Sequence, residues 1–181
     1  RFIDQQSLNG LTEFVPAYDY ALSGVAALLA VFSACMLFPT LARVRSRQTA
    51  ARRLAWQIGG AATMGIGFWS AQNVALLGLR LPVSHYYDHL IGYAALLPVM
   101  AGCAAMIHAL GNGLPSTRRI HAGALSFALG ITALHYVLVA AIHNEVVVAH
   151  DVRHFATALL LCYGSGWLAL HLNRSLIGSG G

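Results

Sequence analysis

Long apolar runs, each about the length of a membrane crossing, constrain this chain more than any other feature. Five runs are predicted to form helices, at about 18–42, 53–79, 87–110, 119–143 and 152–173. A helix needs about 20 apolar residues to cross a hydrocarbon core of about 30 Å. The chain is 57% hydrophobic and 9% charged, whereas soluble domains carry about 25% charged residues. The sequence therefore predicts an all-α, polytopic transmembrane helix bundle.

The charged residues divide between alternate connections of this bundle. Arginines fill the connection at 43–53, begin the helix at 118–119 and follow the last run at Arg174, whereas all six acidic residues lie in the other segments. Cytoplasmic loops are enriched in basic residues. We therefore expect an extracytoplasmic segment at 1–17, a membrane domain at 18–174 and a cytoplasmic tail at 175–181. The net charge of +5 reflects this topology and does not indicate nucleic-acid binding.

A two-helix hairpin repeats along the chain. The segment YDYALSGVAALLAVFSAC (18–35) resembles YDHLIGYAALLPVMAGC (87–103), and 149–166 is a weaker third copy. The helices that follow the first two copies both begin at an arginine pair. The third copy ends after its first helix, so we expect a sixth helix beyond Arg174 that is missing from this chain.

Small residues and a proline predict how these helices pack. Gly65 and Gly130 each follow another small residue four positions earlier, a spacing that lets helix backbones approach closely in lipid. Pro98 lies within a span and predicts a kink. Three cysteines match no zinc or redox spacing and are interpreted as small core residues: Cys35, Cys103 and Cys162.

A histidine and a tyrosine, His135 and Tyr136, lie within the apolar run ITALHYVLVAAIH. An imidazole without a partner is costly in hydrocarbon. Gln72 and Asn73 occupy the equivalent place in the preceding hairpin, so the repeat predicts that the two pairs face a shared interior. One hypothesis is a structural polar cluster, in which His135 forms a hydrogen bond with Gln72, Asn73 or Thr132. The other is a metal site that includes His135.

The repeated hairpins, the arginine pairs and the segments RRLAWQIGGAATMGIGFWS and GITALHY resemble the MHYT domain, a bacterial integral-membrane sensor module. The resemblance extends from about Tyr18 to Arg174. It implies a bacterial inner-membrane location, copper held by Met-His-Tyr-Thr-like motifs, a gas or redox signal, and an attached cyclic-di-GMP or histidine kinase domain. Of those motif residues, His135 and Tyr136 are retained, while Gln72 stands at the histidine position of the first repeat.

Copper(I) prefers several thioether and imidazole donors that converge on one point. The methionines of the resembled motifs are replaced here by leucine, valine and isoleucine, and the chain's own methionines lie elsewhere in their spans. The sequence therefore predicts less than one equivalent of copper, and a copper content that does not depend on His135.

Four histidines at the outer helix ends form a second candidate site: His85, His89, His150 and His154. Each pair has the i,i+4 spacing of one helix face, provided that the third helix begins early. With Asp88 and Asp151 nearby, they could bind Zn²⁺ or Cu²⁺, or titrate near neutrality as a pH-sensitive cap. The remaining interpretation is that they are interfacial residues that anchor helix ends. A haem would instead require a facing pair such as His108 and His121.

Two functions remain open at this point. One is a sensory input domain that passes a periplasmic or intramembrane signal to a cytoplasmic output domain. The alternative is a non-sensory membrane anchor or assembly subunit of a larger complex. We expect no catalysis by this segment, because the sequence shows no nucleophile–base pair or phosphate loop. Proton-coupled transport is also not expected, because no acidic residue lies deep in a span. The expected partners are the lipid bilayer, a cytoplasmic domain or partner subunit, and a second copy in a homodimer.

Overall fold

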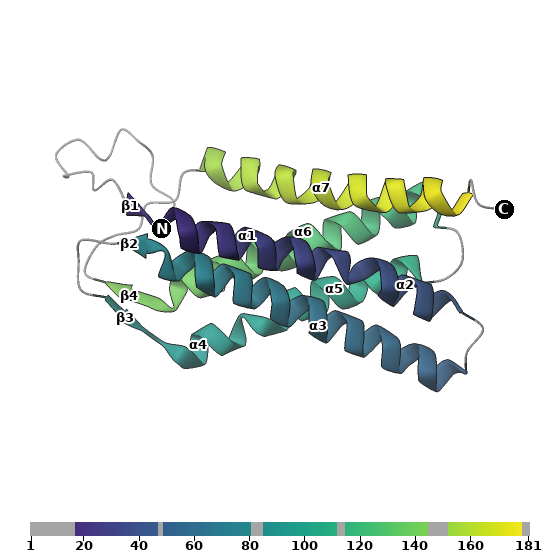
Figure 1. The fold of residues 1–181 in the computed structure, drawn as a ribbon, viewed down its shortest axis with the longest axis horizontal. Coiled ribbons are helices and arrows are strands. Elements are labelled where there is room, and N and C mark those ends of the chain that lie inside the picture. The colour runs from purple at the N-terminus through teal and green to yellow at the C-terminus, as the bar shows by residue number, and fades with distance from the viewer. Residues whose placement is uncertain (1–16, 47–48, 81–84, 112–114, 145–151, 179–181) are drawn as a thin grey trace.

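The computed structural model describes residues 17–46, 49–80, 85–111, 115–144 and 152–178 (Figure 1). Seven helices and four short strands make up this part of the chain. The helices are α1 (Tyr20–Cys35), α2 (Leu37–Arg45), α3 (Ala50–Leu77), α4 (His89–Ala94), α5 (Leu96–Leu110), α6 (Thr117–Ala140) and α7 (Val152–Gly178). The strands are β1 (Ala17–Tyr18), β2 (Leu79–Arg80), β3 (His85–Tyr87) and β4 (Ile142–Asn144).

Four helical segments are long and apolar enough to cross a membrane: Tyr20–Arg45, His89–Leu110, Thr117–Ala140 and Phe155–Leu172. The 28-residue α3 is less apolar, and it packs between α1 and α5. At about 1.5 Å per residue it is about 42 Å long, which exceeds the thickness of a hydrocarbon core. The predicted transmembrane helix bundle is therefore confirmed.

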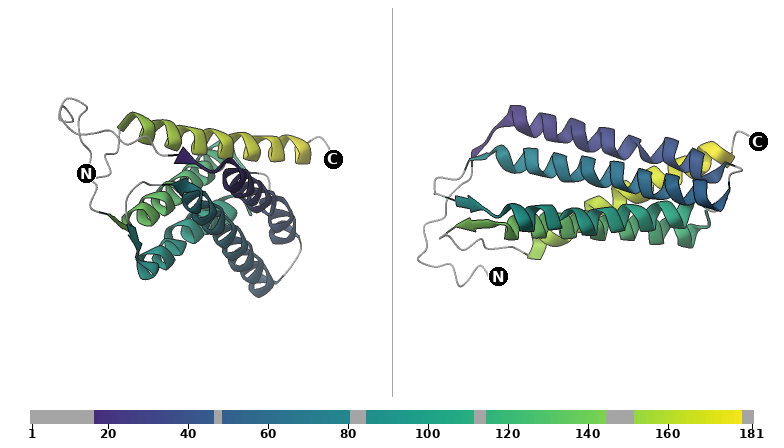
Figure 2. Two further views of the ribbon diagram at one scale, coloured as in Figure 1. Left: turned by 60° about the vertical axis from the view of Figure 1, so that its left-hand side comes forward. Right: turned by 90° about the horizontal axis from the view of Figure 1, so that it is seen from below.

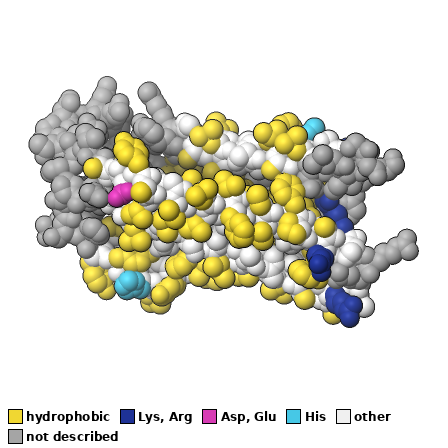
Figure 3. Space-filling view, in the orientation of Figure 1, with side chains coloured by type: hydrophobic (Ala, Val, Ile, Leu, Met, Phe, Trp, Pro, Cys, Tyr) yellow, Lys and Arg dark blue, Asp and Glu magenta, His cyan; other side chains and the backbone are white. Residues whose placement is uncertain are grey.

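The long helices pack in the order in which they follow one another along the chain. The main contacts join α1 to α3, α3 to α5, α5 to α6 and α6 to α7, whereas α3 touches α6 only slightly. The hairpins lie side by side, and α7 crosses the second of them (Figure 2). Apolar side chains cover most of the face seen in Figure 3, with arginines gathered at one end. A surface of this kind is suited to lipid.

The two complete hairpins end in the same way, and this confirms the sequence repeat. In each hairpin a short antiparallel ladder joins the two ends, β1 with β2 in the first and β3 with β4 in the second. An aspartate then begins the helix. Asp19 accepts hydrogen bonds from Ala21 N and Leu22 N, and Asp88 accepts them from Leu90 N and Ile91 N. We call this end of the bundle the strand end.

The ladders were not expected from the sequence, which placed helix up to 79 and 143. The structure ends α3 at Leu77 and α6 at Ala140 instead. In both hairpins the backbone N–H of the capping aspartate donates to the residue after the second helix: Asp19 N to Gly78 O over 2.9 Å, and Asp88 N to Ala141 O over 2.8 Å. These bonds hold the two chain segments together and extend them into strands.

Prolines interrupt two of the membrane segments. A proline in a helix clashes with the carbonyl group four residues earlier and removes its hydrogen bond. For Pro39 and Pro98, those carbonyl groups belong to Cys35 and Ala94, which are the last residues of α1 and α4. The break expected at Pro98 is thus present, and Pro39 produces a second break that the sequence analysis did not anticipate.

Glycines bring α5 and α6 into close contact. A Cβ atom placed on Gly102 would lie 2.9 Å from Gly130 Cα and 2.7 Å from Ser126 O. Gly65 of α3 lies equally close to Met100 of α5, and so joins the two hairpins. The close packing predicted from small residues at four-residue spacing is therefore confirmed.

The core is centred on α5, whose buried side chains contact α2, α3 and α6. Cys103 belongs to it, as expected for a small core residue, and Cys162 is half-buried. Cys35, however, is exposed. The interpretation of Cys35 as a core residue was therefore wrong.

The opposite end of the bundle carries most of the described arginines, and we call it the arginine end. Arg45 at the end of α2 donates from Nε to Leu110 O, at the end of α5, over 3.1 Å. The Arg43 guanidinium lies over the Trp56 ring, 5.0 Å from its centroid. The segregation of charge expected from the sequence is thus largely present in space, with Asp19 and Asp88 at the strand end, although Arg80 of β2 also lies there.

Candidate functional site

A side-chain hydrogen bond joins the two complete repeats at equivalent positions. Gln72 of α3 and His135 of α6 meet with Nε2 and Nδ1 separated by 2.9 Å. The amide nitrogen has hydrogen atoms to donate, so the contact requires Nδ1 to be the acceptor nitrogen of a neutral ring. The hydrogen bond expected between His135 and Gln72 is therefore present. It crosses an interface in which α3 and α6 otherwise touch little.

The other two residues of the expected polar cluster face different neighbours. Asn73 donates from Nδ2 to Trp69 O over 2.8 Å and accepts from Tyr87 Oη over 3.1 Å. The Tyr136 ring packs edge-on against Phe155 of α7, with the ring centroids 5.5 Å apart. Consecutive helical residues point about 100° apart. Asn73 therefore bonds to Trp69 and Tyr87, whereas the Tyr136 ring contacts Phe155 and, edge-on, His135.

The donors around His135 do not fit a copper site. The described contacts provide one imidazole and the Gln72 amide, whereas copper(I) requires several converging soft donors. Met64 and Met106 are buried in the core and Met100 packs against Gly65. Within the described residues, no group of three or more His, Cys, Asp or Glu side chains could hold a metal ion.

The second candidate site does not form as two helical histidine pairs. His85 lies in β3, whereas His89 is the first residue of α4, because Asp88 caps that helix. The prediction that His85 and His89 lie on one face of a helix was therefore wrong. His150 lies outside the described residues. His154 belongs to α7, but its side chain is outside what the structure describes.

The histidine proposed for a haem pair has partners on another helix. The His121 ring contacts the Tyr163 hydroxyl through Nδ1, and it stacks on Trp167 with the centroids 6.3 Å apart. Both partners belong to α7. His121 therefore helps to join α6 to α7 at the arginine end, which is a different arrangement from the facing pair with His108.

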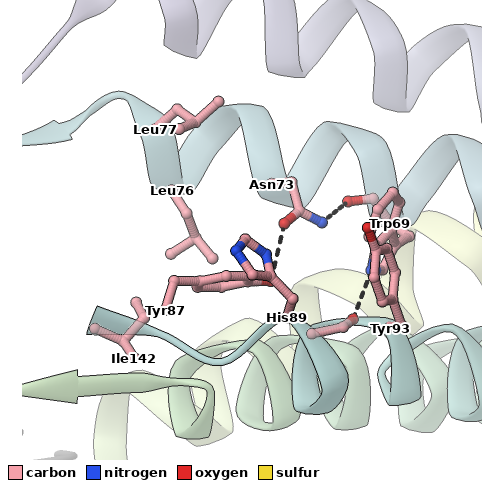
Figure 4. A pocket seen from close by; sticks show the side chains of 9 residues that line it. Trp69, Asn73, Leu76, Leu77, Tyr87, His89, Tyr93 and Ile142 are labelled. Atoms are coloured by element: carbon pink, nitrogen blue, oxygen red, sulfur yellow. Dashed lines mark hydrogen bonds between the residues drawn. The ribbon is translucent and has the colours of Figure 1, made fainter. Parts of the chain in front are cut away.

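A pocket of about 340 Å³ opens between α3 and the start of α4 (Figure 4). Its lining is mostly apolar. The lining residues are Trp69, Asn73, Leu76 and Leu77 of α3, Tyr87 of β3, His89, Gly92 and Tyr93 of α4, and Ile142 of β4.

Hydrogen bonds hold the walls of this pocket in place. Trp69 donates from Nε1 to Gly92 O over 2.8 Å, so the indole ring is tied to α4. The Tyr87 hydroxyl donates to Asn73. Burial, and then the neighbouring Tyr93, raise the pKa of Tyr87, which keeps its hydroxyl protonated as a donor. Gly92 has no side chain, and a Cβ atom there would collide with the Tyr87 hydroxyl.

The pocket was not predicted from the sequence, although the sequence carries a signal of it. Trp69, Asn73 and Leu76 follow one another at spacings of four and three, which places them on one face of α3. His89 and Tyr93 have the same relationship on α4. Two helices that each present an aromatic and a polar residue at i,i+4 spacing form the two sides of the cavity.

No known family profile matches the chain, and no solved structure is significantly similar to it. Two proteins of Pseudomonas aeruginosa are similar in sequence. The bifunctional diguanylate cyclase/cyclic di-GMP phosphodiesterase MucR is 29% identical over 158 residues, 85% of this chain and 22% of MucR. The cyclic di-GMP phosphodiesterase NbdA is 25% identical over 170 residues, 94% of this chain and 22% of NbdA. The chain spans about a fifth of the length of these relatives and is similar to one segment of two cyclic di-GMP enzymes.

Proposed function

We propose that this chain is an integral-membrane sensory input domain of the MHYT type, which passes a signal to a cytoplasmic cyclic-di-GMP domain. The observation that supports this most directly is its similarity, over 85% of its length, to a segment of a bifunctional cyclic di-GMP enzyme. The matched segment is 22% of that enzyme, so most of the enzyme's length lies outside it and can contain the catalytic domains.

The hydrogen bond between Gln72 and His135 supports a route for the signal. It links two hairpins across a slight contact, so a small change in helix packing is enough to make or break it. Interhelical hydrogen bonds of this kind contribute about 0.6–2 kcal/mol in a bilayer. A difference of that size shifts a two-state equilibrium about 3- to 30-fold. The arginine end then faces the cytoplasm, where an output domain would connect.

A chimera tests the proposal. This chain replaces the matched segment of MucR, and cyclic di-GMP is measured in cells that lack other sources of it. We expect Gln72→Leu and His135→Leu to change cyclic di-GMP about 3-fold or more, in the same direction. Thr63→Val is the matched control, because the hydrogen bond of Thr63 among the described residues stays within α3, to Gly59 O. An anchoring role predicts equal output from all variants and from an unrelated helical anchor, and that result would overturn the proposal.

A further inference from the structure

We propose that the pocket between α3 and α4 binds a quinone-type molecule, with a flat carbonyl-bearing ring and a hydrocarbon tail, taken from the bilayer. The cavity of about 340 Å³ lies within the range of small-molecule sites. It is about twice the size of a cavity of roughly 150 Å³ that accommodates benzene. It therefore has room for a substituted ring and the first carbons of a tail.

The two ends of the pocket differ in chemistry. Trp69 and Tyr93 form an aromatic end, whereas Leu76, Leu77 and Ile142 form an aliphatic end (Figure 4). The flat ring of a quinone fits beside the aromatic end, and its hydrocarbon tail fits beside the aliphatic end. The walls are already held by the bonds of Trp69 to Gly92 and of Tyr87 to Asn73, so binding requires little ordering of the protein.

Two polar side chains of the pocket lining, His89 and Tyr93, are available to a ligand. The His89 ring stands edge-on to Tyr87, with centroids 5.4 Å apart, and its nitrogens have no hydrogen bond to the described residues. A neutral imidazole offers one N–H group, which can donate to a ring carbonyl. The indole N–H of Trp69 and the hydroxyl of Tyr87 are already engaged, so the His89 ring and the Tyr93 hydroxyl are the groups that can meet the ligand's oxygen.

A quaternary ammonium headgroup fits this site less well than a neutral ring. A cation needs the faces of several aromatic rings turned towards it. Here Trp69 and Tyr93 stack on each other, with centroids 5.9 Å apart and an interplanar angle of 27°, so each ring covers one face of the other. Among the described residues of the lining, no carboxylate adds attraction.

The pocket can be reached from the lipid. Tyr93 is 59% exposed and Leu77 is 75% exposed, and both lie on the wall of the opening. His89 follows the N-terminal cap of a membrane segment, so it lies near the level of the lipid headgroups. The ring of an amphiphile lies at the same level when its tail remains in the hydrocarbon. A membrane-soluble amphiphile is therefore the ligand that the position favours.

The test titrates decylubiquinone into the full chain in nanodiscs. Trp56→Phe and Trp167→Phe leave Trp69 as the sole tryptophan, and its fluorescence reports quenching. We expect saturable quenching of Trp69, and a midpoint raised about tenfold by His89→Leu, the effect of one lost hydrogen bond. Leu76→Phe, which fills the aliphatic end, should remove saturation. Circular dichroism verifies that both variants keep their helix content.

Two controls separate binding from partition into the bilayer. A chain whose sole tryptophan is Trp167 should show only linear quenching. His108→Leu, which removes an exposed histidine of α5, should leave the Trp69 midpoint unchanged. Linear quenching of Trp69, a midpoint unaffected by His89→Leu, or competition by tetramethylammonium would overturn the proposal. Binding is measured without an output domain, so it succeeds or fails independently of the chimera.

Discussion

At the scale of single residues, the contact between Gln72 and His135 decides how the two repeats meet. A double-mutant cycle with Gln72→Leu, His135→Leu and the double variant measures its strength. We expect each single variant to unfold more easily in micelles, with a coupling energy of about 0.6–2 kcal/mol. For independent sites, the changes in the free energy of unfolding add to within about 0.3–0.5 kcal/mol. A coupling energy no larger than that would show that Gln72 and His135 do not interact.

The same histidine yields a second prediction, which concerns metal. One imidazole beside an amide is a poor copper site, because copper(I) is held by several soft donors. We expect purified protein to carry less than one copper per chain, and His135→Ala to leave that content unchanged. Elemental analysis after dialysis measures it. One copper per chain in the wild type that is lost in His135→Ala would show that His135 does belong to a copper site.

At the scale of elements, the approach of α5 to α6 depends on two facing glycines. Gly102→Ala places a methyl group against the backbone of Gly130, and overpacking of this kind costs about 1–3 kcal/mol. Gly24→Ala is the matched control, because nothing lies within 4 Å of a Cβ atom there. In α1 that change should be neutral or stabilise by up to about 1 kcal/mol. Thermal unfolding in detergent compares the two, and equal effects would refute a close contact.

At the scale of the whole molecule, the arginine end is expected to face the cytoplasm. Cysteines are introduced at Ser46 in the arginine end or at Tyr86 in the strand end, in a chain without native cysteines. Both positions are exposed. An impermeant maleimide applied to spheroplasts should label Tyr86→Cys directly, and Ser46→Cys only after lysis. The reverse pattern would invert the topology.

Sequence reasoning predicted the membrane helices, the hairpin repeat, the small-residue contacts and one of the two proline breaks. These features are local: a backbone in lipid must satisfy its own hydrogen bonds within helices, and a proline acts on the carbonyl four residues earlier. The Gln72–His135 bond was also accessible, because the repeat placed both residues at equivalent positions.

Only the tertiary structure decided which neighbours the adjacent polar residues meet. Asn73 and Tyr136 point about 100° away from Gln72 and His135, so the packing of α3, α5, α6 and α7 directs them to Tyr87 and Phe155 instead. The pocket likewise combines α3, β3 and the start of α4 with Ile142 of β4, which lies far from them in the sequence. The sequence by itself determined the membrane helices and their repeat. The tertiary structure decided the site, because a cavity depends on how helices cross.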